Sequence, residues 1–408
     1  MVITGIEISG FRGIEHLELL ELDRHANLFL GVNGAGKSSL LDAISNVMSW
    51  FVARMQSVSG RGKDIPVNDI SLFSNSGCTL KIQLDGGDWC SLYRSQDRVK
   101  TGKSDLSTLN VLVRDLRDRI ASNDKASVPI FVHYGVSRAV VDIPLRIKHS
   151  QRGGVTDAYT NALVSRASFR DFFSWFREQE DFENEQIREN PSYRDKSMEA
   201  IREAMGKIFP NFGDMRVKRR PRSIQIRKGN NVLRLEQLSD GEKCYIALVC
   251  DLTRRLSIAN PGDGSPLLGA GIVLIDEIDL HLHPEWQRDV VSRLVTTFPN
   301  CQFFMTTHSP IVASDVEGKV FAIEDGQAME RFTYGKDSEQ ILASAFSMLN
   351  ARNKRVQLLI DDAYKAIHSG DNEGVTTRLQ ELVEIIGADD PAVARLKVEM
   401  ARQRNRRQ

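Results

Sequence analysis

The sequence lacks the features that would direct it to a membrane or to an oxidising compartment. No apolar run approaches the roughly 20 residues that a bilayer-spanning helix needs. The N-terminus MVITGIEISGFRG has no basic stretch followed by an apolar core, as a signal peptide would have. The five cysteines are odd in number and lack metal-ligand spacing, which argues against a disulfide framework. We therefore expect a cytoplasmic protein without membrane contact.

An excess of charge of either sign is also missing. The chain has 54 Lys and Arg against 54 Asp and Glu, so its formal net charge is zero. No global field attracts nucleic acid, and any such binding must depend on a local patch. With 408 residues the chain can bury a large core, either in one domain with insertions or in two domains.

What the sequence does contain is a phosphate-binding loop. An apolar run ending at Leu30 leads into Gly31-x-x-x-x-Gly36-Lys37-Ser38, and helical apolar periodicity follows. This is the strand–loop–helix context that the motif requires. Glycines let the backbone turn so that N–H groups point at phosphate oxygens, and the positive end of the helix favours the same anion. Lys37 and the Ser38 hydroxyl suit the β/γ-phosphates and Mg²⁺. We predict that the chain binds a nucleoside triphosphate.

Three further motifs follow late in the chain. LSDGE opens a helix that begins near Ser239, and GIVLIDEID reads as a buried strand that ends in two adjacent acids, Asp276 and Glu277. A second buried strand, 301–305, runs into TTHSP, which contains His308. Ligands bind at the carboxyl ends of the strands in open α/β sheets, so these side chains are expected at one sheet edge.

The remaining pattern indicates how the chain is organised. Three strands are expected within 2–30, a hairpin within 79–94 around DGGD, and a buried strand at 128–134. From 146 to 210 two helical patterns, one with Phe169, Phe172, Phe173 and Phe176, predict an insertion that stands off the nucleotide core. Residues 211–335 carry the later motifs, and 336–408 read as almost purely helical.

Three segments allow two interpretations each. Arg12, in the turn GFRG, is either a solvated residue or one that folds back onto the nucleotide. The basic segment Arg216–Lys228, interrupted by Pro221, is either a charged edge strand or a phosphate-contacting patch for nucleic acid. The helical region 336–408, whose basic end RQRNRRQ is expected to fray, either docks a partner or an identical subunit, or caps the sheet.

The order of these motifs resembles that of ABC-type ATPases, and FRG, GxNGxGKS and HLHP are similar to the RecF/SMC and OLD branch. The resemblance implies an α/β fold: an ABC-type P-loop ATPase head with an antiparallel β subdomain, here with a helical insertion and an all-helical C-terminal tail. It implies ATP and Mg²⁺ as ligands, with the metal held by Ser38 and Asp276. Glu277 resembles the general base, and His308 the switch histidine at the γ-phosphate, with Lys37 as a third catalytic residue. The residues that it places around the nucleotide are Arg12, Asn33, Gly34, Ala35, Gly36, Lys37, Ser38 and Ser39.

The same resemblance predicts a shared site. Ser239, Gly241 and Glu242 resemble the signature loop, which in this group reaches the γ-phosphate of a second subunit, and Asp279 resembles the loop residue that links the two sites. One phosphate loop and one signature loop in a chain imply at least a homodimer. The glutamine that usually follows the strand ending here at Tyr134 is missing, so the residue that senses Mg²⁺ is not identified.

Within this branch the layout looks like the ATPase subunit of the Septu anti-phage system (PtuA), which implies a separate HNH-nuclease partner. No nuclease site is visible in this chain. Two alternatives stay open at this point. One is a RecF-like repair ATPase that binds duplex DNA, and the other is a scaffold that binds ATP with little turnover.

Overall fold

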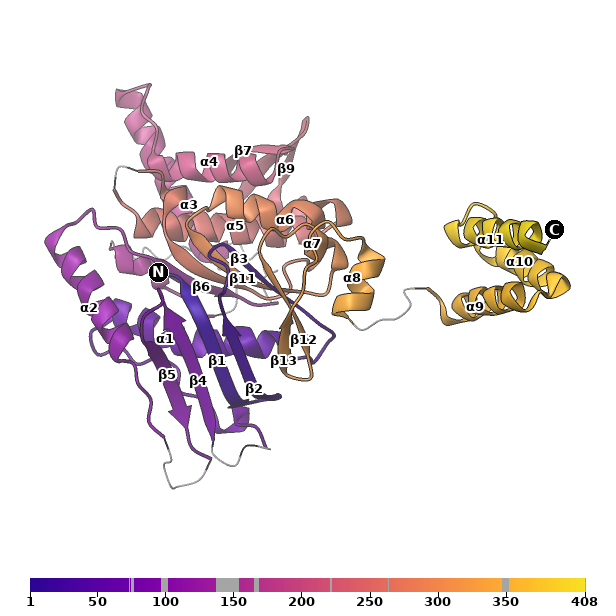
Figure 1. Ribbon diagram of the computed structural model, residues 1–408. Coiled ribbons are helices and arrows are strands. Elements are labelled where there is room, and N and C mark those ends of the chain that lie inside the picture. Colours follow the sequence, from indigo (N-terminus) through magenta and orange to yellow (C-terminus); the bar gives the residue numbers. More distant parts are fainter. Residues whose placement is uncertain are drawn as a thin grey trace. The chain divides into compact units, whose positions relative to one another are not determined.

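The computed structural model describes residues 1–72, 74, 77–96, 102–136, 154–164, 169–220, 222–262, 264–346 and 352–407. The chain divides into two compact units, Met1–Ser338 and Glu339–Gln408, and each is considered by itself (Figure 1). The division lies close to the boundary expected after residue 335. The boundary expected after residue 145 lies outside the described residues.

A six-stranded sheet forms the centre of the first unit, in the order β13-β12-β3-β11-β10-β6. Its strands are β3 (Ala26–Leu30), β6 (Ile130–Tyr134), β10 (Gly271–Ile275), β11 (Cys301–Thr307), β12 (Lys319–Glu324) and β13 (Gln327–Glu330). All pairs are parallel except β12–β13. Every residue of β3, β6, β10 and β11 is buried, as in parallel sheets covered on both faces. The order places the ends of β3, β11 and β10 side by side.

The second sheet is antiparallel and has the order β2-β1-β4-β5. It consists of β1 (Ile3–Phe11), β2 (Ile14–Leu20), β4 (Cys78–Leu84) and β5 (Trp89–Arg94). Helix α1 (Lys37–Gln56) contacts β1 and β4 of this sheet and β6, β10 and β11 of the central one. The helix after the phosphate loop is therefore held between two sheets, which is why most of its residues are buried. Helix α2 (Ser107–Ser122), which packs on α1 and β5, was not predicted.

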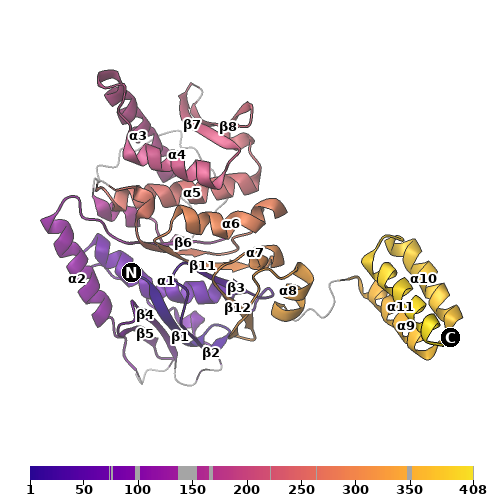
Figure 2. The same ribbon diagram turned by 45° about the horizontal axis from the view of Figure 1, so that its top comes forward.

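The opposite side of the central sheet carries α5 (Asp240–Ala259) and α6 (Pro284–Thr297), and above them lie α3 (Phe169–Glu189) and α4 (Lys196–Ile208) (Figure 2). Helix α4 contacts both α5 and α6, and α3 contacts α5. The expectation that the insertion stands off the core is therefore wrong. Phe172, Phe173 and Phe176 are buried, because the aromatic stripe is the face that packs against the core.

The basic segment Arg216–Lys228 forms a hairpin instead of one interrupted strand. Strand β7 (Phe212–Arg219) pairs with β8 (Arg222–Lys228), which pairs with β9 (Asn231–Arg234) in a three-stranded antiparallel sheet. The remaining helices of this part are short. They are the 3₁₀ helices Val67–Asp69, Val155–Tyr159, Leu235–Gln237 and Pro266–Leu268, together with α7 (Pro310–Ser314).

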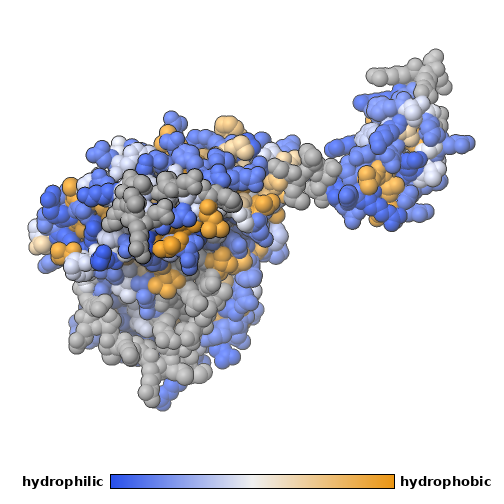
Figure 3. All heavy atoms as spheres, turned by 90° about the horizontal axis from the view of Figure 1, so that it is seen from below, coloured by the Kyte–Doolittle hydropathy of each residue, from blue (hydrophilic) through white to orange (hydrophobic). Residues whose placement is uncertain are grey.

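The second unit is helical, as the periodicity predicts. After α8 (Ser338–Ala345), which begins at the division, come α9 (Lys354–Ser369), α10 (Asn372–Ile386) and α11 (Pro391–Arg407). They enclose a small core that includes Ala363, Leu382 and Leu396. The face of this unit seen in Figure 3 is mainly hydrophilic, with apolar side chains exposed in places. Helix α11 continues to Arg407, through most of the basic end that was expected to fray.

These observations confirm the expected fold class: an α/β head with an antiparallel β subdomain, helices inserted before β7 and a helical C-terminal region. All five cysteines are buried, and none of them forms a disulfide. In the part of the chain that the structure describes, no helix is both long and apolar enough to cross a bilayer.

Candidate functional site

The phosphate loop joins β3 to α1 at the edge of the central sheet. Gly34 (φ 83°) and Gly36 (φ 107°) have left-handed backbone conformations that favour glycine. The N-cap residue of α1 is Gly36, which has no side chain that could cap the helix, and the first N–H groups of a helix have no acceptor within it. Those groups and the positive end of the helix dipole suit an anion. The Lys37 Nζ donates to the carbonyls of Gly31 (2.8 Å) and Val32 (3.0 Å), so the ammonium group lies across its own loop.

A hollow of about 210 Å³ lies over this loop. Its lining combines loop residues with the acids that follow β10 and the histidine that follows β11: Asn33, Gly34, Gly36, Lys37, Ser38, Ser39, Asp276, Glu277 and His308. Sequence segments more than 230 positions apart are brought together because β3, β11 and β10 are neighbours in the sheet.

The two acids are held by backbone and side-chain hydrogen bonds. The Asp276 N–H donates to the Tyr134 carbonyl (2.8 Å). The Thr306 hydroxyl donates to Asp276 Oδ1 (2.5 Å) and accepts from the Glu277 N–H (2.8 Å). Glu277 has a φ of 49°, a conformation that a residue other than glycine adopts only when its surroundings impose it. The acids are therefore oriented before any ligand binds.

The charges in the hollow favour a ligand with both anionic oxygens and a metal. Burial lowers the pKa of Lys37, and the carboxylates of Asp276, Glu277 and Asp279 act in the opposite direction. A cation and two acids thus line the hollow, and the charge of a third acid, Asp279, also acts on Lys37. Phosphate oxygens suit the lysine and the loop N–H groups, and a divalent cation suits the Ser38 hydroxyl and the Asp276 carboxylate.

Asp279 does not line the hollow, although it lies close by. Its carboxylate accepts a short hydrogen bond from the Thr307 hydroxyl, which also accepts from the Ser309 N–H (2.9 Å). Ser309 in turn caps α7 and donates through its hydroxyl to Gln287 (2.7 Å). The segment after Glu277 is therefore tied to the end of β11.

The signature segment also lies outside the lining of the hollow. Ser239 and Glu242 form a capping box at the start of α5: the Ser239 Oγ accepts from the Glu242 N–H (3.3 Å), and Glu242 Oε2 accepts from the Ser239 N–H (3.0 Å). Gly241 packs against the backbone of His281, and a Cβ at that position would lie 2.0 Å from the His281 carbonyl oxygen. The signature loop is thus preformed and packs against the HLHP segment.

Two other residues expected at the nucleotide are not in the lining. Ala35 lies within the loop, and its N–H donates to the Val32 carbonyl (3.3 Å). The Arg12 guanidinium is engaged by two carboxylates, Asp42 (2.6 Å) and Asp69 (2.9 Å). Arg12 therefore joins the antiparallel sheet to α1 and to the loop after it.

Residues that sequence reasoning missed complete the surroundings. Thr306 was not singled out, although it belongs to the TTHS motif that drew attention to His308. His133, one residue before the end of β6, is buried, and burial lowers its pKa while Asp42 and Asp276 act against that effect. In the sequence, the only feature that pointed to His133 was its place next to Tyr134, at the end of the strand that a glutamine usually follows.

The chain is similar to known proteins over most of its length. Residues 26–314 match the family described as "AAA domain, putative AbiEii toxin, Type IV TA system". The chain is 27% identical over 473 residues to the Retron Ec83 probable ATPase of Escherichia coli, which covers 98% of this chain and 86% of that protein. It is 23% identical over 416 residues to the Septu protein PtuA of Bacillus thuringiensis, which covers 98% of each.

The predicted likeness to the Septu ATPase subunit is confirmed by that relative. Among solved structures, the Smc head bound to the C-winged helix domain of ScpA aligns with a TM-score of 0.48 and 15% identity, over 81% of this chain and 97% of that one. The family model spans most of the chain and includes the phosphate loop, the signature segment, both acids and His308. The chain belongs to the family of the AAA domain, putative AbiEii toxin, Type IV TA system.

Proposed function

We propose that this chain is the cytoplasmic, ATP-hydrolysing subunit of a bacterial anti-phage defence complex, in which an ATP-gated oligomer controls an HNH nuclease supplied in trans. The observation that carries the ATPase part is the convergence of Lys37, Asp276, Glu277 and His308 on one hollow. The similarity to a retron ATPase and to Septu PtuA supports the defence role.

ATP fits the donor set of the hollow, and Mg²⁺ fits the pairing of Ser38 with Asp276. When bound, Mg²⁺ neutralises charge on the β- and γ-phosphate oxygens. The chain's own contribution begins at the loop, where Asn33 to Ser39 surround the phosphates with N–H groups. Lys37 leaves the carbonyls of Gly31 and Val32, which it now contacts, and turns its ammonium group to the phosphate oxygens.

Hydrolysis requires a base near the attacking water, and Glu277 takes that role. Its backbone strain and the Thr306 contact fix where the carboxylate can point. A general base must lie within hydrogen-bond reach of the water it polarises. His308, which follows β11, contacts the γ-phosphate side of the hollow and stabilises the charge that develops there.

The working unit is at least a homodimer. Ser239, Gly241 and Glu242 are outside the lining of the hollow that Lys37 shares with Asp276. A second copy supplies this loop to the γ-phosphate, and Asp279 links the two sites. A symmetric pair of heads then closes on two ATP molecules. The nuclease partner docks on the helical C-terminal unit, which has its own core and exposes Leu358, Ile385 and Val398.

A RecF-like ATPase that binds duplex DNA is the alternative, and one observation favours it. Arg216, Lys218 and Arg220 alternate along β7 and its end, and all three are exposed. Side chains two residues apart share a face of a strand, so these cations form one outward row. DNA binding through this row predicts that log K falls with log salt by about 0.9 per phosphate contacted.

Glu277→Gln tests the proposed ATPase. The amide keeps the shape of the carboxylate but accepts a proton far less readily, so we expect ATP hydrolysis to slow by about 100-fold or more. ATP binding should persist and trap a dimer that light scattering detects. Equal, near-zero turnover in the wild-type and variant proteins would instead identify an ATP-binding scaffold.

A further inference from the structure

Lys228 differs from the other basic residues of the β7–β8 hairpin in the face that it occupies. Alternate residues of a strand share a face, and Ile224 and Ile226 of β8 are buried. Lys228 belongs to the same inward-facing set. Arg227 belongs to the outward-facing set and pairs with the exposed Asp214 (2.6 Å). The basic segment is therefore two-sided, and Lys228, whose side chain is 42% exposed, lies on the face that the two isoleucines share.

The partner of Lys228 is a residue of the signature loop. Its Nζ lies 2.5 Å from Glu242 Oε1, and the side chain of Glu242 is only 13% exposed. The other oxygen of the same carboxylate accepts from the Ser239 N–H. Burial would raise the pKa of Glu242, but the hydrogen bonds from Lys228 and Ser239 outweigh it and hold this pKa below its usual value. One carboxylate thus connects the hairpin to the start of α5.

A cluster of aromatic rings fixes the base of the hairpin against the same helix. The Lys228 Nζ lies 5.5 Å from the centroid of the Phe212 ring, its partner in the β7–β8 register. The Phe209 ring is 5.7 Å from Phe212, 4.9 Å from Tyr245 of α5 and 5.5 Å from Trp286 of α6.

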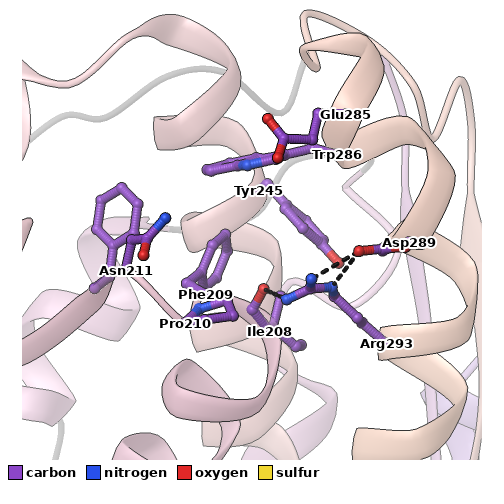
Figure 4. A pocket seen from close by; sticks show the side chains of 10 residues that line it. Ile208, Phe209, Pro210, Asn211, Tyr245, Glu285, Trp286, Asp289 and Arg293 are labelled. Carbon is purple, nitrogen blue, oxygen red and sulfur yellow. Dashed lines mark hydrogen bonds and ion pairs between the residues drawn. The ribbon is translucent and has the colours of Figure 1, made fainter. Parts of the chain in front are cut away.

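Figure 4 shows Phe209, Tyr245 and Trp286 gathered around a small hollow of about 100 Å³. On its far side the Arg293 guanidinium bonds to Asp289 (2.7 Å) and to the Ile208 carbonyl (3.0 Å). Rings and ion pair together join the end of α4, and hence the start of the hairpin, to α5 and α6. Lys228 is therefore held in a defined place relative to Ser239.

We propose that Lys228 is a positioning residue for ATP hydrolysis. Through Glu242 it holds Ser239 and the start of α5 in the orientation in which the signature loop engages the nucleotide of a second copy. This proposal rests on the proposed function. Lys228 does not line the hollow that contains Lys37, so it acts on closure of the dimer and on turnover, and ATP binding to the phosphate loop of the same copy does not depend on it.

Lys228→Met tests this role, with Lys81→Met as a matched control. Lys81 also pairs with a partly buried glutamate, Glu7 (2.9 Å), but on the antiparallel sheet. We expect Lys228→Met to lower kcat about 10-fold while Kd for ATP, measured in the Glu277→Gln background, changes less than about twofold. Lys81→Met should leave kcat unchanged. Lys228→Arg should retain most of kcat, because a guanidinium also donates to Glu242.

A double-mutant cycle tests whether Lys228 acts through Glu242. If Lys228 acts through Glu242, then Lys228→Met combined with Glu242→Gln lowers kcat no further than the more harmful single change. Additive losses would overturn the proposal, as would a kcat of Lys228→Met equal to that of Lys81→Met. If melting shows that Lys228→Met does not fold, Lys228→Gln takes its place, with the same expected split between kcat and Kd.

Failure of the proposed function and failure of the positioning role give different results. If the wild-type protein does not hydrolyse ATP, or Glu277→Gln hydrolyses it equally fast, the proposed function fails and this inference fails with it. If the wild-type protein turns over ATP and Glu277→Gln does not, but Lys228→Met behaves like wild type, only the positioning role is wrong.

Discussion

At the scale of single residues, the site depends on one hydroxyl group that joins both acids. Thr306 donates to Asp276 and accepts from the backbone of Glu277, so its single O–H and one of its two acceptor positions are used. The strained φ of Glu277 persists because this contact and the end of β10 impose it. The orientation of the two acids is thus a property of β11 as well as of β10.

Thr306→Val should therefore impair hydrolysis more than ATP binding. Valine keeps the shape but leaves the partly buried Glu277 N–H without this acceptor, which costs about 1–3 kcal/mol of stability. We expect kcat to fall about 10-fold or more, measured in a steady-state ATPase assay. Thr297→Val is the control, because the Thr297 hydroxyl is buried without a hydrogen-bond partner among the described residues. An equal effect of both changes would show that Thr306 acts only as packing.

Residue types in the phosphate loop and at the end of β10 could be predicted from sequence, because each depends on local spacing. Lys37 and Glu277 are examples. The roles of Thr306 and Lys228 could not be predicted in the same way. Their partners are 29 and 14 positions away, and only strand register and side-chain direction bring them into contact. Arg12 is the opposite case. Its local motif suggested contact with the nucleotide, whereas in the structure its guanidinium pairs with Asp42 and Asp69.

At the scale of elements, α5 combines the signature loop with a buried ionic cluster. Asp251, which is fully buried, accepts from Arg255 (2.7 Å), Arg254 (2.7 Å) and the Tyr134 hydroxyl (2.9 Å). Arg255 also donates to the carbonyl of Ala158 (2.7 Å). Because the Tyr134 carbonyl accepts from Asp276, the cluster connects the signature helix to the acids of the site.

Asp251→Ala should be strongly destabilising. It leaves the buried Arg255 without its counter-charge, which costs about 3–5 kcal/mol. Asp289→Ala removes an i,i+4 pair with Arg293 that is partly exposed, and such pairs contribute at most about 1 kcal/mol. Urea unfolding of both variants measures the difference. Similar losses of free energy would contradict the account of α5.

The pH dependence of the same cluster follows from its charges. Burial would raise the pKa of Asp251, but Arg255 and Arg254 outweigh it and hold this pKa below its usual value. A lowered carboxyl pKa contributes stability above the unfolded-state value, about 3.9, and this stability is lost as pH falls through the folded-state pKa. Below about pH 4 the free energy of unfolding should therefore fall less steeply in Asp251→Asn than in the wild-type protein.

The helices of the insertion show what apolar periodicity can and cannot predict. The buried positions Phe172, Phe173 and Phe176 were predictable as one face, since their spacing is local. The surface that this face covers depends on how the chain returns to α5, which periodicity does not specify. Helix α2 had its own signal, in Leu109, Val113 and Leu116 at helical spacing, but it lies next to a polar linker and is mostly exposed.

At the scale of the whole molecule, motifs that are far apart in the sequence lie together at one edge of the central sheet. Parallel pairing places the ends of β3, β11 and β10 next to one another, so a loop near residue 36 and acids near residue 276 share a hollow. The signature loop does not line that hollow. In the proposed function, a second copy of the chain supplies this loop and completes the site.

Mixing two inactive variants tests this claim most directly. Glu277→Gln copies keep an intact signature loop but lack the base, and Ser239→Arg copies keep the base but lack an intact signature loop. Each variant is therefore expected to be inactive alone. A mixed dimer contains one site that has the base of one copy and the signature loop of the other. An equal mixture should therefore recover ATPase activity to about a quarter of the wild-type value. If the mixture stays as inactive as its components while both variants fold and bind ATP, the shared site does not exist.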